Sequence, residues 1–521
     1  MTRNAANSDS ERLCGDSEHP THLDNDARFK ETESTKDLNR RSVRGGVITL
    51  FGQACRLVLS IGGTAVLARL LTPADFGLIA MCATITGFAA IFKDVGLTAA
   101  TIQRKSITHA QTSTLFWINA AIGFILMLGV GALAPAVGWF YGEPRLVVVL
   151  LAISSSFVFG GLAAQHIAVL RREMRYTELA VIDVGALAVS FGTAIALASA
   201  GAGYWALAAQ PIVLALGTAV GAWVLCRWLP SLPVRGAGVR SMLAFGSSVT
   251  GFNVLNYLSR NMDNVLIGWR LGASPLGIYS RAYGLVLMPI RQINAPVSSV
   301  VMTALSRLQD DADAFRVYYL RAIAMLAFVT MPLIALAFAT ADEIVLILLG
   351  DQWTQAADVF RLLAPAAFVG AVNVAPGWLC MTLGRPERQL RWAMIAAPVS
   401  VTGFVIGLRW GISGIATAFS ITFCIMFVVF VQYACVGSPV RARNVWMALW
   451  RPSTAAIGSA AGTMVLVQFI ADTVDTVIGQ FAERAVVFGA LYLGTWMCLP
   501  GGAQLLRRYI RMMRHLRSPV E

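Results

Sequence analysis

Charge is what this sequence has least of. Only 13% of its 521 residues are Asp, Glu, Lys or Arg, whereas 57% are hydrophobic. Soluble domains carry about 25% charged residues. The apolar residues come in blocks of roughly twenty, the length at which a helix crosses the hydrocarbon of a bilayer. This composition excludes an ordinary soluble protein and predicts an all-α polytopic membrane protein.

Motifs for metal, disulfide or enzyme chemistry are also missing. The eight cysteines form no CxxC pair and the five histidines no HExxH motif, so we expect no metal site and no cofactor. No P-loop or nucleophile elbow occurs, and no loop is long enough for a catalytic domain. The sequence therefore predicts a protein that is not an enzyme. The net charge of +13 is assigned to membrane loops rather than to nucleic acid.

The hydropathy pattern predicts about fourteen transmembrane helices. They are read at about 47–71, 76–97, 113–134, 146–169, 179–199, 203–225, 241–267, 276–301, 320–340, 357–381, 390–409, 411–434, 453–471 and 483–500. An even number of spans places both termini on the same side of the membrane.

Basic residues alternate between the connections. One side carries runs such as Arg171, Arg172 and Arg175, while the other carries TPAD (72–75) and an acidic 341–356 loop. Because Lys and Arg mark cytoplasmic loops, both termini are predicted to be cytoplasmic.

The two halves of the chain resemble each other at an offset near 200. Spans 1 and 7 each carry a polar stripe at spacing 3-4-4, which places it on one helix face. The stripes are Gln53, Arg56, Ser60 and Thr64, and Asn253, Asn256, Arg260 and Asn264. A short turn follows each span, with Gly77 matching Gly277. Spans 1–6 and 7–12 therefore look like two copies of one six-helix unit in the same orientation, a parallel repeat of the kind found in transporters.

This repeat divides the chain into five parts. They are a disordered cytoplasmic tail at 1–45, an N-lobe at 46–235, a C-lobe at 236–437, two further spans within 438–503, and a basic cytoplasmic tail at 504–521. The first tail has no apolar block, so it can bury no core and is no signal peptide.

Polar and charged residues inside spans are costly to expose to lipid, so they are the candidates for a cavity. The hypothetical substrate-binding residues are Arg56, Ser60, Asn256, Arg260, Asp263, Arg281 and Arg291. Arg260 and Asp263 are three residues apart and can pair on one helix face, which would make them a structural ion pair instead. The surplus of arginine over acid favours an anionic substrate, because guanidinium groups bind phosphate in bidentate fashion.

The stretch YLSRNMDNVLIGWRLGASPLGIYSRAYGLVLMPIRQINAPVSSVVMTALSRLQDD (257–311) resembles the signature region of Wzx-type bacterial polysaccharide flippases, of the colanic-acid-exporter branch. ARLLTPADFGLIAM (68–81) and FKDVGLTAATIQRKS (92–106) resemble the N-terminal region of the same family. The resemblance covers about residues 45–450. Met302-Thr303 departs from the aromatic-proline pair that the family pattern has before ALSRLQ, which bears on local packing only.

The resemblance implies the fold of the MOP exporter superfamily, two six-helix bundles forming a V plus two C-terminal helices. It also implies a function in the bacterial inner membrane, the transfer of undecaprenyl-pyrophosphate-linked oligosaccharide repeat units from the cytoplasmic to the periplasmic leaflet by alternating access. The implied partners are that lipid-linked oligosaccharide, membrane lipid and a polysaccharide polymerase. Two alternatives stay open: a drug or small-molecule exporter of the same superfamily, and a membrane enzyme such as a polymerase or ligase. The sequence does not name the sugar unit or the coupling ion.

Overall fold

The computed structural model describes residues 35–93, 107–234, 260–469 and 476–500, together with residues 98, 101, 102, 254, 257, 258 and 502. The first group of helices comprises α2 (Thr35–Leu70), α3 (Pro73–Ala90), α5 (His109–Tyr141), α6 (Arg145–Arg172), α7 (Tyr176–Ser199) and α8 (Tyr204–Cys226). Residues 260–271 are helical and lead into the second group. That group comprises α10 (Ala273–Arg307), α11 (Ala312–Ala339), α12 (Ala341–Leu348), η1 (Asp351–Trp353), α13 (Thr354–Gly370), α14 (Val374–Thr382), α15 (Pro386–Gly407), η2 (Leu408–Trp410) and α16 (Gly411–Cys435). The last two helices are α17 (Ala442–Phe469) and α18 (Val477–Cys498).

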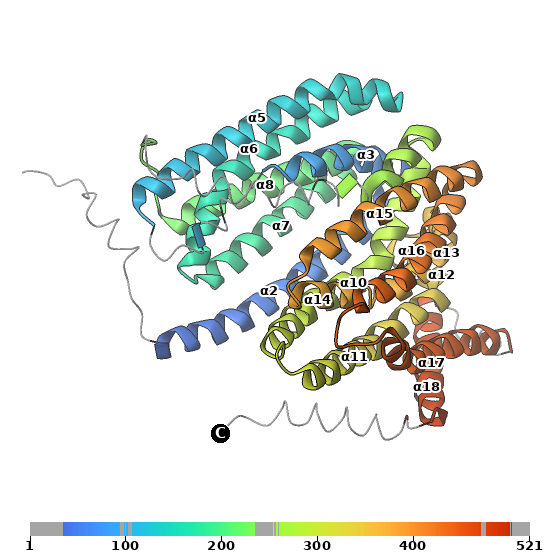
Figure 1. Cartoon of the computed structure of the whole chain (residues 1–521). Helices are drawn as coiled ribbons and strands as arrows, with labels where there is room; N and C mark the ends of the chain where they lie inside the picture. The colour runs from blue at the N-terminus through green and yellow to red at the C-terminus, as the bar shows by residue number, and fades with distance from the viewer. Residues whose placement is uncertain are drawn as a thin grey trace, which may run out of the picture.

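The helices form two bundles (Figure 1). In the N-lobe, α5 packs on α6, α7 on α8 and α2 on α7. In the C-lobe, α10, α13 and α16 pack together, and α15 lies on α16. The helices α3 and α10 make the main contact between the lobes, while α17 packs on α11 and on α18. The described part of the chain is an all-α bundle, as the sequence predicts.

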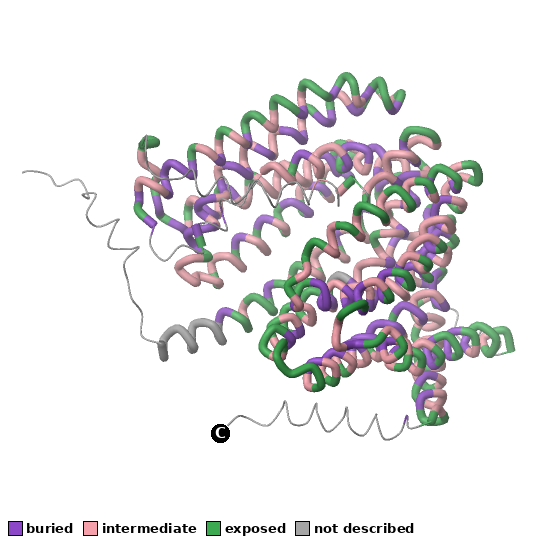
Figure 2. The backbone as a smooth tube through the Cα atoms, in the orientation of Figure 1, coloured by how far each residue is buried: buried purple, intermediate pink, exposed green. Residues whose placement is uncertain are grey.

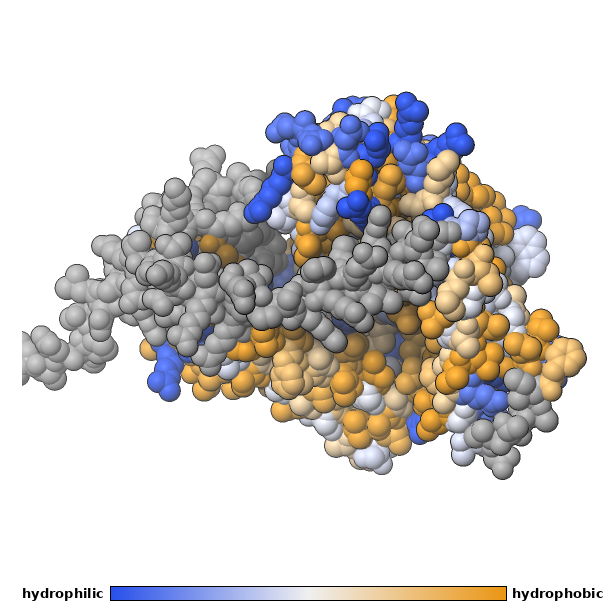
Figure 3. Space-filling view, turned by 90° about the horizontal axis from the view of Figure 1, so that it is seen from below, coloured by the Kyte–Doolittle hydropathy of each residue, from blue (hydrophilic) through white to orange (hydrophobic). Residues whose placement is uncertain are grey.

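The surface of the bundle suits a lipid environment. Eleven helical stretches among the described residues are long and apolar enough to cross a membrane, and one of them, Pro386–Cys435, contains both α15 and α16. Large hydrophobic side chains such as Ile125, Val486 and Phe469 are exposed. Figure 2 shows exposed residues along the outward sides of α5 and α15 and buried residues where helices meet. In Figure 3, apolar side chains cover much of the coloured surface.

The span expected at 357–381 is broken into two helices. α13 ends at Gly370 and α14 begins at Val374, with a turn between them in which Asn373 N–H bonds to Gly370 O at 3.3 Å. Proline has no N–H to donate to the carbonyl four residues back, so Pro376 cannot close the helical bond to Val372. Three further prolines, Pro289, Pro296 and Pro365, lie inside α10 and α13. The 341–356 segment, expected as a loop, contains α12 and η1.

The first turns of α3 and α10 touch backbone to backbone. A Cβ added to Gly77 would lie 1.7 Å from the carbonyl oxygen of Ala273, and one added to Gly277 would lie 1.8 Å from that of Pro73. Neither contact leaves room for any side chain, since real Cβ atoms essentially never approach other atoms this closely. Only glycine permits so close a helix crossing.

The same end of the molecule is held by hydrogen bonds from the C-lobe to the last turn of α2. The carbonyls at a helix C-terminus have no partners within the helix. Trp353 Nε1 donates to Ala68 O at 2.8 Å, and Gln352 Nε2 donates to Ala68 O at 2.6 Å and Leu71 O at 3.0 Å. Arg69 donates in return to Ile347 O at 2.8 Å. We call this region, residues 68–77, 272–277 and 347–353, the closed end.

A buried ion pair fastens α12 to α18. Arg484 bonds to Glu343, whose side chain is only 5% exposed. The second carboxylate oxygen of Glu343 has no hydrogen-bond partner among the described residues. Removing the cation would therefore leave a buried carboxylate without compensation.

Substituting Arg484→Ala should destabilise the protein by about 3–5 kcal/mol, the cost of breaking a buried ion pair. The matched control is Arg145→Ala, because Arg145 pairs with Glu143 at 2.8 Å while its own side chain is 52% exposed. An exposed pair contributes about 0–1 kcal/mol. The apparent melting temperature of the detergent-purified protein checks this, and equal melting temperatures for the two variants would contradict it.

Candidate functional site

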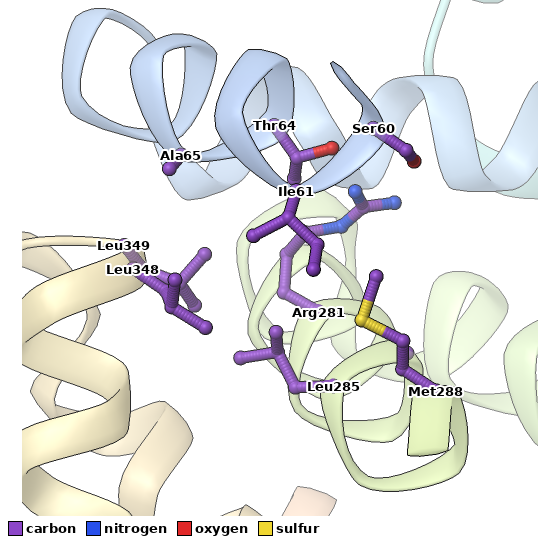
Figure 4. A pocket seen from close by; sticks show the side chains of 10 residues that line it. Ser60, Ile61, Thr64, Ala65, Arg281, Leu285, Met288, Leu348 and Leu349 are labelled. Atoms are coloured by element: carbon purple, nitrogen blue, oxygen red, sulfur yellow. The ribbon is translucent and has the colours of Figure 1, made fainter. Parts of the chain in front are cut away.

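The polar stripe of α2 faces α10 across a small pocket. Ser60 and Thr64 line it from α2, Arg281, Gly284, Leu285 and Met288 from α10, and Leu348 and Leu349 from the segment at the end of α12. The cavity measures about 170 Å³. Figure 4 shows the guanidinium group of Arg281 lying toward Ser60 and Thr64. The pocket thus joins the predicted residues Ser60 and Arg281 and lies between the two lobes.

Arg281 has no acidic partner among the described residues. Its guanidinium carbon lies 4.9 Å from the centre of the Phe76 ring, a cation–π contact with α3. Its Nε is buried and has no hydrogen-bond partner in the described part of the chain. A guanidinium group presents five donors in a fixed fork, so an arginine held by an aromatic face alone keeps unused donors. Arg281 can therefore bind an oxyanion in the pocket.

Arg56 lies one helical turn from Ser60 on the same stripe and is already paired. Its Nη1 donates to Asp183 Oδ2 on α7 at 3.0 Å, and the two side chains are 52% and 46% exposed. Four residues along a helix correspond to about 6 Å, so this pair is next to the pocket. Asp183 was absent from the sequence-based candidates, although a lone carboxylate inside the 179–199 span is the signal that could have identified it.

The suggested pairing of Arg260 with Asp263 is wrong. Asp263 is 2% exposed, and its Oδ2 accepts a hydrogen bond from the hydroxyl of Tyr279 at 2.9 Å. Its Oδ1 accepts one from the N–H of Asn264 at 2.8 Å, while Arg260 is exposed. A buried phenol can satisfy a carboxylate without a second desolvated charge, which is why Tyr279 takes the place predicted for Arg260.

Two predicted site residues remain untested by the structure. Asn256 lies outside the described residues, and so does the side chain of Arg291, whose backbone belongs to α10. The structure instead adds Asp183, Phe76 and the leucines Leu348 and Leu349 to the surroundings of the site.

Sequence comparison relates the chain to proteins of polysaccharide biosynthesis. It is 24% identical to the lipopolysaccharide biosynthesis protein WzxC of Escherichia coli (strain K12), with 80% of this chain and 85% of WzxC covered. It is 26% identical to the succinoglycan biosynthesis transport protein ExoT of Rhizobium meliloti, with 86% and 91% covered.

Solved structures share the fold. The lipid II flippase MurJ, in an inward closed conformation, matches with a TM-score of 0.69 at 13% identity, over 87% of this chain and 98% of MurJ. An inward-facing multidrug resistance MATE family transporter of the MOP superfamily matches with a TM-score of 0.57 at 14% identity, over 73% and 94%. The family model described as "Polysaccharide biosynthesis protein" matches residues 66–358. Because this match spans more than half of the chain, the protein belongs to that polysaccharide biosynthesis family.

Proposed function

We propose that this protein is a flippase that moves lipid-linked oligosaccharide repeat units from the cytoplasmic to the periplasmic leaflet of the bacterial inner membrane. The observation that carries the proposal is Arg281, a half-buried arginine without an acidic partner among the described residues, in a pocket between two lobes. WzxC and ExoT are named for polysaccharide biosynthesis and transport, and MurJ for flipping a lipid-linked precursor, which agrees with this role.

The ligand that Arg281 would hold is the diphosphate of an undecaprenyl carrier. Diphosphate oxygens accept the parallel hydrogen bonds that a guanidinium fork donates. The volume of about 170 Å³ suits a phosphate headgroup and leaves the sugars in the space between the lobes. No acid lines the described pocket. An exporter of cationic drugs would need one, so the pocket favours the lipid-linked substrate.

Transport would proceed by alternating access with no covalent step. We place the closed end on the periplasmic side and both termini in the cytoplasm, because the basic connections lie at the opposite ends of the helices. In this state the α3–α10 contact and the hydrogen bonds to α2 would seal the outer side. Opening that side would require the lobes to separate there. A polysaccharide polymerase in the periplasm would then receive the released repeat unit.

Arg281→Gln should lower export on the order of tenfold or more, since a hydrogen bond to a charged group contributes about 1.5–3 kcal/mol. Arg281→Lys should be impaired too, because an ammonium group lacks the bidentate fork. Both variants are expressed in a deletion strain, and lipid-linked repeat units are quantified in the membrane.

The control for charge alone is Arg409→Gln, because Arg409 lies in η2 at an exposed position and does not line the pocket. Membrane levels of each variant are compared by immunoblot. Export at the wild-type rate by a stably inserted Arg281→Gln protein would refute the role of this arginine.

Gly277→Val should force the closed end apart and shift the population toward the state open to the periplasm. A Thr64→Cys label site in a background free of native cysteines reports this shift. Its modification by a membrane-impermeant thiol reagent added from outside should be faster with Gly277→Val than without it. Gly458→Val, on α17 at a glycine that has nothing within 4 Å and does not line the pocket, should leave the rate unchanged. Equal rates in the two valine variants would argue against a gate at this contact.

A further inference from the structure

The stripe of α2 that carries Arg56 faces the space between the lobes. Ser60 and Thr64 line the pocket opposite Arg281, and Arg56 precedes Ser60 by one turn on the same face. The Arg56–Asp183 pair therefore lies about one helical turn from the pocket. A ligand that reaches Arg281 along this face passes Arg56.

Close helix packing holds Asp183 in this position. A Cβ added to Gly52 would lie 3.3 Å from the Cβ of Ala180, and one added to Gly63 would lie 2.2 Å from the Phe191 ring. These contacts, before and after Arg56 along α2, keep α7 at a fixed register. The packing of the two backbones thus places Asp183 opposite Arg56, so a carboxylate stays near this arginine for as long as the two helices are packed together.

The pair is too exposed to act as a structural clamp. Both side chains are about half exposed, at 52% and 46%, and ion pairs of this kind contribute little net stability. A stronger anion can therefore displace the carboxylate from Arg56 at low cost. The fixed carboxylate acts instead as a permanent competitor for whichever anion approaches this arginine.

We propose that Asp183 is a specificity-determining residue that keeps phospholipids with a single negative charge from occupying Arg56 and admits lipid diphosphates. This inference rests on the proposed function, because it concerns the same substrate path. A phospholipid with one negative charge gains almost no binding free energy at Arg56, because its phosphodiester only replaces the interaction that the carboxylate of Asp183 already makes. A diphosphate brings a second negative charge and more acceptor oxygens, so it outcompetes Asp183. Discrimination by an unfavourable interaction with the wrong ligand is a general source of specificity.

The test is Asp183→Asn, which keeps the shape of the side chain and removes its charge. Native mass spectrometry of the purified full-length protein measures retained phosphatidylglycerol relative to phosphatidylethanolamine, which has no net charge. We expect the variant to retain on the order of fivefold more phosphatidylglycerol than the wild type, the scale of an exposed ion pair. The double variant Arg56→Gln/Asp183→Asn should return to the wild-type ratio.

Glu178→Gln is the matched control. Glu178 lies on the same helix and forms an ion pair with Arg175 at 3.0 Å, and neither residue lines the pocket. It should leave the lipid ratio unchanged. An unchanged ratio in Asp183→Asn, or a raised ratio that persists in the double variant, would overturn the proposal.

A second measurement separates this proposal from the proposed function. Transport of an undecaprenyl-diphosphate-linked saccharide is followed in proteoliposomes with and without phosphatidylglycerol. The wild type should tolerate the anionic lipid, whereas Asp183→Asn should be inhibited by it. Suppose that neither the wild type nor Asp183→Asn transports the probe, but that the ratio of retained phosphatidylglycerol to phosphatidylethanolamine changes as expected. The proposed function then fails, and the role of Asp183 in excluding monoanions stands.

Discussion

The contact between the first turns of α3 and α10 determines how the two lobes meet. At Gly77 and Gly277 the two helix backbones lie so close that neither position has room for a Cβ atom. Around this contact the C-lobe satisfies the free carbonyls at the end of α2, through Gln352 and Trp353. These interactions place α2 and α10 so that Ser60, Thr64 and Arg281 line one pocket together with apolar side chains. The position of Arg281 opposite Ser60 follows from that arrangement.

Three charged residues inside the bundle have three different kinds of interaction partner. Glu343 is buried and paired with Arg484, which fastens α12 to α18. Asp263 is buried and satisfied by the phenol of Tyr279. Arg281 is half-buried, lies against an aromatic ring and keeps free donors. Its buried Nε has no hydrogen-bond partner among the described residues, which is costly, and a bound anion could supply one.

The sequence predicted the features that depend on the membrane environment and on the spacing of apolar and polar residues along a helix. Apolar blocks depend on local spacing, and they correctly indicated an all-α membrane bundle. The polar stripe of α2 also follows from spacing, and its Ser60 lines the pocket. The pairing of Asp263 was mispredicted because Arg260 is its neighbour in sequence, while Tyr279 reaches it only through the packing of two helices. Asp183 and Phe76 were missed for the same reason. Their contacts with Arg56 and Arg281 join elements whose relative positions no local pattern encodes.

The partners at the joint between the lobes are reciprocal. Gly77 contacts Ala273, and Gly277 contacts Pro73. At the offset of 200 residues Gly277 corresponds to Gly77 and Ala273 to Pro73, so the two contacts join equivalent pairs of positions. This is the arrangement of an isologous interface in a two-fold symmetric dimer, where residue i contacts j and j contacts i. At this joint the chain thus has the contact pattern of two subunits associated about a dyad. The joint is symmetric although the charges near it differ, as Arg56 with Asp183 on α2 and α7 and Arg281 on α10 illustrate.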